Sequence, residues 1–203
     1  MTKHTVEWIP SDKAALEYIK MRGYASYSSL RNVRDCIEPS EIKSTKYFDI
    51  GTEVHAQFLE NYKKLKLTKE DHKAVDSMIA SLNSHPVVTK IMDGALTEQK
   101  FSLKLKGMPV LGYIDILPPK TSIGDLKTTR HKNLHDFAAN MEFLQAALYL
   151  AAMKRKDFYY VGIQKEPPFK VFVFNVRQYP ERLEKANKEL DYLLKYVKQK
   201  TGL

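Results

Sequence analysis

The sequence predicts an α/β fold in which a mixed central sheet is flanked by helices and preceded by a helical N-terminal region. Helical periodicity dominates the first 95 residues, and short alternating segments separated by turn residues follow from residue 96. Apolar helical patterns return on either side of the last two of these segments. A length of 203 residues suits one domain. We therefore expect a single domain over 1–203, with a mostly helical part at 1–95 and the sheet core at 96–203.

Start and stop signals predict four helices in the first part of the chain. Their ranges are 10–20, a segment beginning at Ser26-Tyr-Ser-Ser, 48–62 and 69–82. Thr68 can cap the fourth helix, which must end before His85-Pro86 because a residue preceding proline disfavours the helical conformation.

Five strands and two further helices are expected after residue 96. The strand ranges are Thr97–Leu105, Val110–Leu117, Ser122–Thr128, Phe158–Gln164 and Phe169–Asn175. Turn residues separate the first three, which predicts an antiparallel meander. Between the third and fourth strands, residues Leu134–Lys154 predict one long helix, and Pro180–Lys198 predicts an amphipathic helix that closes the sheet core.

Charge and cysteine content limit the classes of function. The chain has 33 Lys and Arg against 24 Asp and Glu, a net charge of +9, which suits a polyanionic partner such as nucleic acid. The single cysteine excludes an internal disulfide and a cysteine-based metal cage. We find no apolar run long enough for a membrane span and no signal-peptide core, so a cytoplasmic protein is expected.

Three charged residues on two neighbouring predicted strands are the candidate catalytic group. Because strand side chains alternate, Asp125 and Lys127 should share one face with Asp115 close by, while Leu126 points to the opposite layer. Carboxylates suit Mg²⁺ or Mn²⁺, with the Leu126 carbonyl as a third ligand. Lys127 could orient or deprotonate the attacking water, or offset phosphate charge. The alternative is a salt bridge on a sheet surface.

Three motifs together resemble the PD-(D/E)XK nuclease superfamily, and more narrowly its RecB/RecE-like branch, which includes phage recombination exonucleases. They are Gly112-Tyr-Ile-Asp115, Asp125-Leu-Lys127-Thr and Gln145-Ala-Ala-Leu-Tyr149. The resemblance implies a restriction-endonuclease-like core. The acid of the third motif in this chain is Asp125 rather than Glu, and most of the branch shares this aspartate.

The resemblance also implies roles for residues outside these strands. His55, in Gly51-Thr-Glu-Val-His55, is similar to the branch's Gly-x-x-x-His motif and implies a metal ligand or a contact to one. Gln145 and Tyr149 share a helix face and would fasten that helix to the site. Glu98 stands where the branch commonly has a glutamate near the metal. The alternatives are a surface histidine, a packed tyrosine and an exposed edge-strand glutamate.

A second group of residues is expected to contact DNA. The spacing of Arg22 and Ser29 resembles the segment of lambda-type exonucleases that grips a 5′-phosphate, although Ser28 or Ser29 could simply cap a helix. Arg130 and Lys132 could line a track for the DNA backbone.

The resemblance implies a Mg²⁺- or Mn²⁺-dependent exonuclease that digests double-stranded DNA ends 5′ to 3′ in phage-type recombination by single-strand annealing. It further implies a ring-shaped homo-oligomer (trimer or tetramer), an annealing partner protein and, if phage-encoded, the bacterial host cytoplasm. The alternatives are a structure-specific or repair endonuclease of the same superfamily and a non-catalytic DNA-binding protein on this fold.

Overall fold

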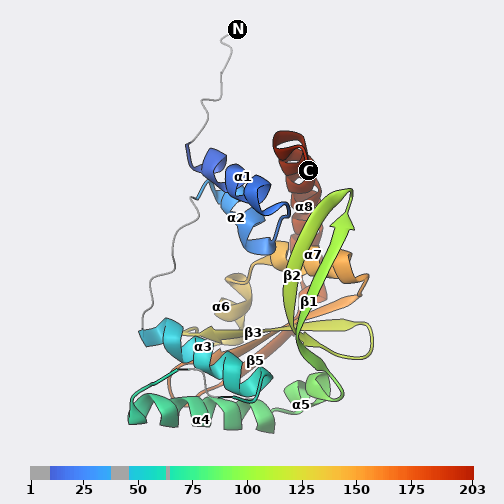
Figure 1. The fold of residues 1–203 in the computed structure, drawn as a ribbon. Coiled ribbons are helices and arrows are strands. Elements are labelled where there is room, and N and C mark those ends of the chain that lie inside the picture. Colours follow the sequence, from blue (N-terminus) through green and yellow to red (C-terminus); the bar gives the residue numbers. More distant parts are fainter. Residues whose placement is uncertain (1–9, 38–45, 63–64) are drawn as a thin grey trace.

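The computed structural model describes residues 10–37, 46–62 and 65–203 (Figure 1). The α-helices are α1 Pro10–Arg22, α2 Tyr27–Asp35, α3 Lys46–Leu59, α4 Lys69–Ser84, α5 Pro86–Met92, α6 Leu134–Ala139, α7 Phe143–Met153 and α8 Pro180–Thr201. The strands are β1 Leu96–Leu105, β2 Met108–Leu117, β3 Ser122–Thr129, β4 Asp157–Gln164 and β5 Val171–Asn175, and a short 3₁₀ helix, η1, covers Val176–Gln178.

The five strands form one mixed sheet in the order β1-β2-β3-β4-β5. β1, β2 and β3 make the expected antiparallel meander, and β4 lies parallel to β3. A parallel neighbour requires a crossover, which α6 and α7 provide. β5 then returns antiparallel to β4. The fold class predicted from the sequence is confirmed.

Hydrophobic clusters cover both faces of the sheet. On one face, α1, α2, α7 and α8 pack with sheet residues such as Ile123 and Phe158. On the other face, α3, α4 and α5 pack with Leu126 and Val161. Ile123 and Leu126, three positions apart on β3, belong to different clusters, as the alternation of the strand predicts.

The N-terminal helices do not form a separate layer. α1 and α2 join the face of the sheet covered by α8, and backbone pairing of Ala25 with Val110 ties them to β2. α3 to α5 lie against the opposite face, so the two helical groups occupy opposite ends of the molecule in Figure 1.

The single long helix expected at Leu134–Lys154 is wrong, because the segment forms two helices, α6 and α7. Asn140 ends α6, and the Arg182 guanidinium of α8 donates hydrogen bonds of 2.8, 3.2 and 3.0 Å to the carbonyls of Ala138, Ala139 and Met141. These contacts supply donors to carbonyls at the end of the helix, where the Ala138 carbonyl also accepts from the Met141 N–H. The break therefore depends on a residue about forty positions away.

Other boundaries differ by a few residues. Pro86 ends α4 as expected, but it also occupies the first turn of an unpredicted helix, α5, where its missing N–H costs nothing. β5 begins at Val171 rather than Phe169, because Phe169 has a positive φ of 54° in the preceding turn. α3 ends at Leu59, three residues early. None of the described helices is long and apolar enough to cross a membrane.

Candidate active site

The second and third strands separate where the acidic residues lie. The ladder between β2 and β3 consists of the Ile116–Gly124 pair, after which the strands diverge. In the gap, the Leu126 N–H donates a 2.8 Å hydrogen bond to Asp115 Oδ2 instead of to a strand neighbour. The separation therefore lets a carboxylate stand between two strands of one sheet.

Asp125 is held on β3 by two partners. The Lys127 ammonium lies 2.6 Å from its Oδ2, and the Gln145 side-chain amide of α7 donates a 2.6 Å hydrogen bond to its Oδ1. Asp125 is 1% exposed, and apart from Lys127 no donor among the described residues reaches Oδ2. The expected convergence of Asp125, Lys127 and Gln145 is found.

A second group of side chains could hold a metal ion. One ligand atom from each of His55, Glu98 and Asp115 lies within 4.8 Å of the other two, and His55 Nδ1 is 3.8 Å from Asp115 Oδ2. One imidazole nitrogen and two carboxylate oxygens are a donor set that suits a divalent cation. These residues therefore fit the expected cofactor. Asp125 lies outside this three-residue cluster.

Glu98 reaches the cluster through the pairing of β1 with β2. Thr97 pairs with Ile116 and Gln99 with Ile114, so Glu98 falls opposite Asp115. Its φ of +49° is unusual for a residue with a side chain, and such backbone strain persists where the surroundings enforce it. The structure thus places Glu98 at the site rather than on an outlying part of the strand.

Two motif glycines permit the close packing that positions these side chains. A Cβ on Gly51 would lie 2.7 Å from the Thr128 hydroxyl, so the glycine lets α3 approach β3 and bring His55 to Asp115. A Cβ on Gly112 would lie 2.6 Å from the Phe101 ring, which packs edge-on against Tyr149. Tyr149 is therefore a buried packing residue beside the site, and Gln145 lies one turn before it on α7.

The clustered charges perturb one another. Burial, together with the nearby Asp125, raises the pKa of the Asp115 carboxyl well above its usual range. Burial alone would lower the pKa of Lys127, but Asp125 and Asp115 outweigh it and the net shift is upward. Burial and the negative charge of Asp125 likewise raise the pKa of Tyr149. Carboxylates that resist ionisation this strongly are typical of functional sites.

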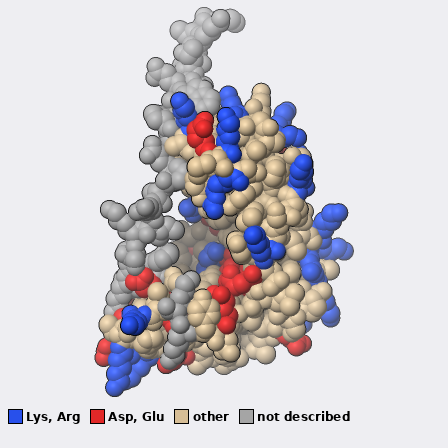
Figure 2. Space-filling model, in the orientation of Figure 1, with Lys and Arg blue, Asp and Glu red and all other residues tan. Residues whose placement is uncertain are grey.

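A cavity of about 340 Å³ adjoins the site on the side of α2. Its lining includes Arg22, Ser26, Ser28, Gly112 and Tyr149. Figure 2 shows this face of the molecule hollowed between the region of α1 and α2 and the region of α3, with acidic side chains along the lower edge.

Ser29, which was expected to contact a 5′-phosphate together with Arg22, has its hydroxyl engaged within α2. Ser29 is buried, and its hydroxyl accepts from the Ser26 N–H at 2.8 Å and donates to the Ser26 carbonyl at 3.0 Å within a capping box. Ser26, rather than Ser28 or Ser29, is the helix cap. Ser26 and Ser28 stand beside Arg22 in the cavity wall instead.

Arg130 and Lys132 are exposed on the segment that follows β3, three and five positions after Lys127. They lie beyond the end of the strand and are absent from the cavity lining described above. Sequence reasoning missed Tyr27, which lines the cavity and whose hydroxyl has a pKa raised by burial and by Glu142. Its position one residue after the Ser26 cap was the available signal.

A mixed sheet that separates between its second and third strands, with Asp on one and Asp-x-Lys on the other, defines a PD-(D/E)XK-like fold. The chain belongs to the family described as PDDEXK-like domain of unknown function (DUF3799), which matches residues 32–201. The expected superfamily is confirmed. Arg22 and Ser29 lie outside the matched range. No curated protein matches the chain.

Several solved structures are similar to this chain, and the first of them shares its fold. A candidate exonuclease from Eubacterium rectale matches with a TM-score of 0.62 and 14% identity, over 96% of this chain and 88% of that one. A phage related exonuclease from Haemophilus somnus 129PT matches at TM-score 0.44 and 14% identity, over 87% of this chain and 94% of that one. An alkaline exonuclease from Laribacter hongkongensis matches with a TM-score of 0.38 and 14% identity, over 92% of this chain and 97% of that one. At these identities the likeness concerns the fold alone.

Proposed function

We propose that the chain is a divalent-metal-dependent deoxyribonuclease that removes nucleotides from the ends of double-stranded DNA. The observation that carries the proposal is the placement of His55, Glu98 and Asp115 beside the Asp125–Lys127 pair, in the gap between β2 and β3. The net charge of +9 favours a polyanionic substrate.

The ligands proposed for the metal are His55, Glu98 and Asp115, joined by Asp125 and the Leu126 carbonyl. In an extended strand the N–H and C=O of one residue point to the same side, so the Leu126 carbonyl should face Asp115 as its N–H does. A bound Mg²⁺ or Mn²⁺ would supply Lewis-acid stabilisation of charge on the phosphoryl oxygens.

The chain's own residues supply orientation and charge. Lys127 places an ammonium group beside the two aspartates, where it can orient the attacking water and offset negative charge on the phosphate. Gln145 fixes the Asp125 carboxylate from α7 and leaves Oδ2 to Lys127. Tyr149 supports α7 through its edge-on contact with Phe101.

Selection of a strand end is proposed for the cavity beside α2. Arg22 contributes a guanidinium group, and Ser26 and Ser28 contribute hydroxyl groups, which suits a terminal phosphate. The polarity that follows is 5′ to 3′. Arg130 and Lys132 are proposed to contact the DNA backbone further along.

The wider setting proposed is phage-type recombination by single-strand annealing in a bacterial host cytoplasm, with one nuclease domain over 1–203. A ring-shaped homo-oligomer and an annealing partner protein belong to the same proposal. It is supported by the motif resemblance.

The test compares DNA substrates that differ at their ends. With Mg²⁺, the parent should digest a linear 5′-phosphorylated duplex, digest a 5′-hydroxyl duplex more slowly and leave a covalently closed circle intact. Lys127→Ala should be inactive, while Lys13→Ala, on the exposed side of α1, should match the parent. Digestion of the circle would favour the endonuclease alternative. Salt-sensitive binding without cleavage would favour the non-catalytic one.

A further inference from the structure

α2 presents two arginines and a tyrosine on one helix face. Tyr27, Arg31 and Arg34 are four and three positions apart, so they lie side by side. Arg34 is neutralised by carboxylates, with an Nη1 to Glu142 distance of 2.9 Å, an Nε to Glu189 distance of 3.6 Å and a further pair with Asp35. The charge of Arg34 is therefore used within the protein.

Arg31 is held differently. Among the described residues no carboxylate forms an ion pair with it, and its Nε is buried without a hydrogen-bond partner. Its guanidinium carbon lies 5.8 Å from the centre of the Tyr27 ring. Buried donors in native proteins are normally paired, so this half-buried arginine has a guanidinium N–H available for an acceptor from outside the chain, whether water or a ligand.

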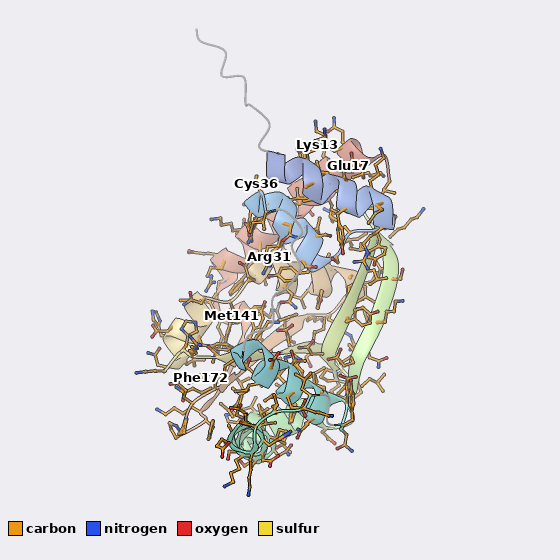
Figure 3. The ribbon with its side chains drawn as sticks, turned by 60° about the vertical axis from the view of Figure 1, so that its left-hand side comes forward. Lys13, Glu17, Arg31, Cys36, Met141 and Phe172 are labelled. Carbon is orange, nitrogen blue, oxygen red and sulfur yellow. The ribbon has the colours of Figure 1, made fainter. Side chains whose placement is uncertain are left out.

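The position of Arg31 relates it to the candidate active site. Tyr27 lines the same cavity as Gly112 and Tyr149. Burial and the charge of Glu142 raise the pKa of the Tyr27 hydroxyl, and the positive charges of Arg31 and Lys127 act against them. Figure 3 shows Arg31 on the side of α2 that faces away from α1.

We infer that Arg31 binds a backbone phosphate of the DNA strand that enters the site, through Nε and one Nη. A guanidinium edge offers two parallel donors that match two phosphate oxygens. The Tyr27 ring, with its centre 5.8 Å from the guanidinium carbon, lies beside the group and helps to position it. The inference rests on the proposed function and deepens it, because it makes α2 a wall of the DNA-binding cleft rather than a structural helix.

The experiment measures binding to duplex ends in EDTA, which prevents cleavage. In a series of duplexes, one backbone linkage at a time near the end is replaced by an uncharged methylphosphonate. Arg31→Met should weaken binding to the unmodified duplex by about tenfold and reduce the salt dependence by about one phosphate contact. At one linkage, neutralisation should cost the parent affinity but cost Arg31→Met nothing further.

Arg31→Lys keeps the charge without the paired donors, and should lose part of the affinity. Arg177→Met, which removes an arginine on η1, is the matched control and should bind as the parent does. Losses that add at every linkage, or parent-like binding by Arg31→Met, would overturn the inference. Thermal melting checks that the variants fold. If the parent digests DNA ends in Mg²⁺ but the losses are additive, the role inferred for Arg31 is refuted and the proposed function is not. If the parent neither digests nor binds DNA, the proposed function is refuted as well.

Discussion

The Gln145 side-chain amide donates a 2.6 Å hydrogen bond to Asp125 Oδ1, which joins α7 to β3 across the floor of the candidate site. Gln145 is 6% exposed and Asp125 1%. A buried carboxylate needs such donors, because burial without them is costly. The contact connects the motif on the helix to the motif on the strand.

Replacing Gln145 by Leu should reduce nuclease activity by about 10- to 100-fold, because residues that orient a metal-site carboxylate typically have effects of this size. The change leaves Asp125 Oδ1 without its donor while keeping the side-chain volume similar. Steady-state cleavage of an end-labelled duplex measures it. Gln199→Leu, on the exposed side of α8, is the control, and equal rates for the two variants would argue against the orienting role.

Gly51→Ala should displace α3 from β3, because the new methyl group would lie 2.7 Å from the Thr128 hydroxyl. Overpacking of this kind costs about 1–3 kcal/mol, partly offset by the better helix propensity of alanine. Urea unfolding should show a lower stability, and metal titration should show a weaker affinity for the metal ion.

Thr128→Ala removes the hydroxyl and leaves the next contact at an ordinary 3.8 Å. The double variant Gly51→Ala/Thr128→Ala should therefore recover both stability and metal affinity. If it performs no better than Gly51→Ala alone, close packing is not the reason for the glycine.

The parts of the site that the sequence could predict are those that depend on local geometry. Strand alternation placed Asp125 and Lys127 together and Leu126 in the other layer, because period two depends on local geometry alone. Glu98 joined the site through its register opposite Asp115, and register is a tertiary property. The end of α6 is stabilised by Arg182 on α8, a contact that helical periodicity does not contain, so the sequence predicts one helix where the structure has α6 and α7.

His55→Ala should lower the affinity for Mn²⁺ on the order of tenfold or more, and affect Mg²⁺ less, because Mg²⁺ relies mainly on oxygen ligands. Electron paramagnetic resonance of Mn²⁺ measures free and bound ion directly. His135→Ala, on the exposed side of α6, supplies the matched control. Unchanged Mn²⁺ affinity in His55→Ala would remove the histidine from the ligand set.

Arg182→Met should destabilise the protein by about 1–3 kcal/mol, because three carbonyls near the end of α6 each lose a hydrogen-bond donor, and the Ala138 carbonyl keeps the Met141 N–H. The guanidinium also lies 4.1 Å from the centre of the Phe143 ring, a contact that methionine only partly replaces. Urea denaturation is the measurement. Lys188→Met, at an exposed ion pair on the same helix, should change stability by less than about 0.5 kcal/mol. Similar losses in both would contradict the capping role.

The central claim is that the gap between β2 and β3 is a metal-dependent nuclease site, and Asp115 tests it because Asp115 joins the metal cluster to the strand backbone. Asp115→Asn keeps an acceptor for the Leu126 N–H but removes the charge. The measurement is Mg²⁺-dependent release of nucleotides from an end-labelled linear duplex, with thermal melting to confirm folding. We expect the parent to release nucleotides and folded Asp115→Asn to be slower on the order of 1,000-fold. Equal release by the parent and the variant would contradict the claim.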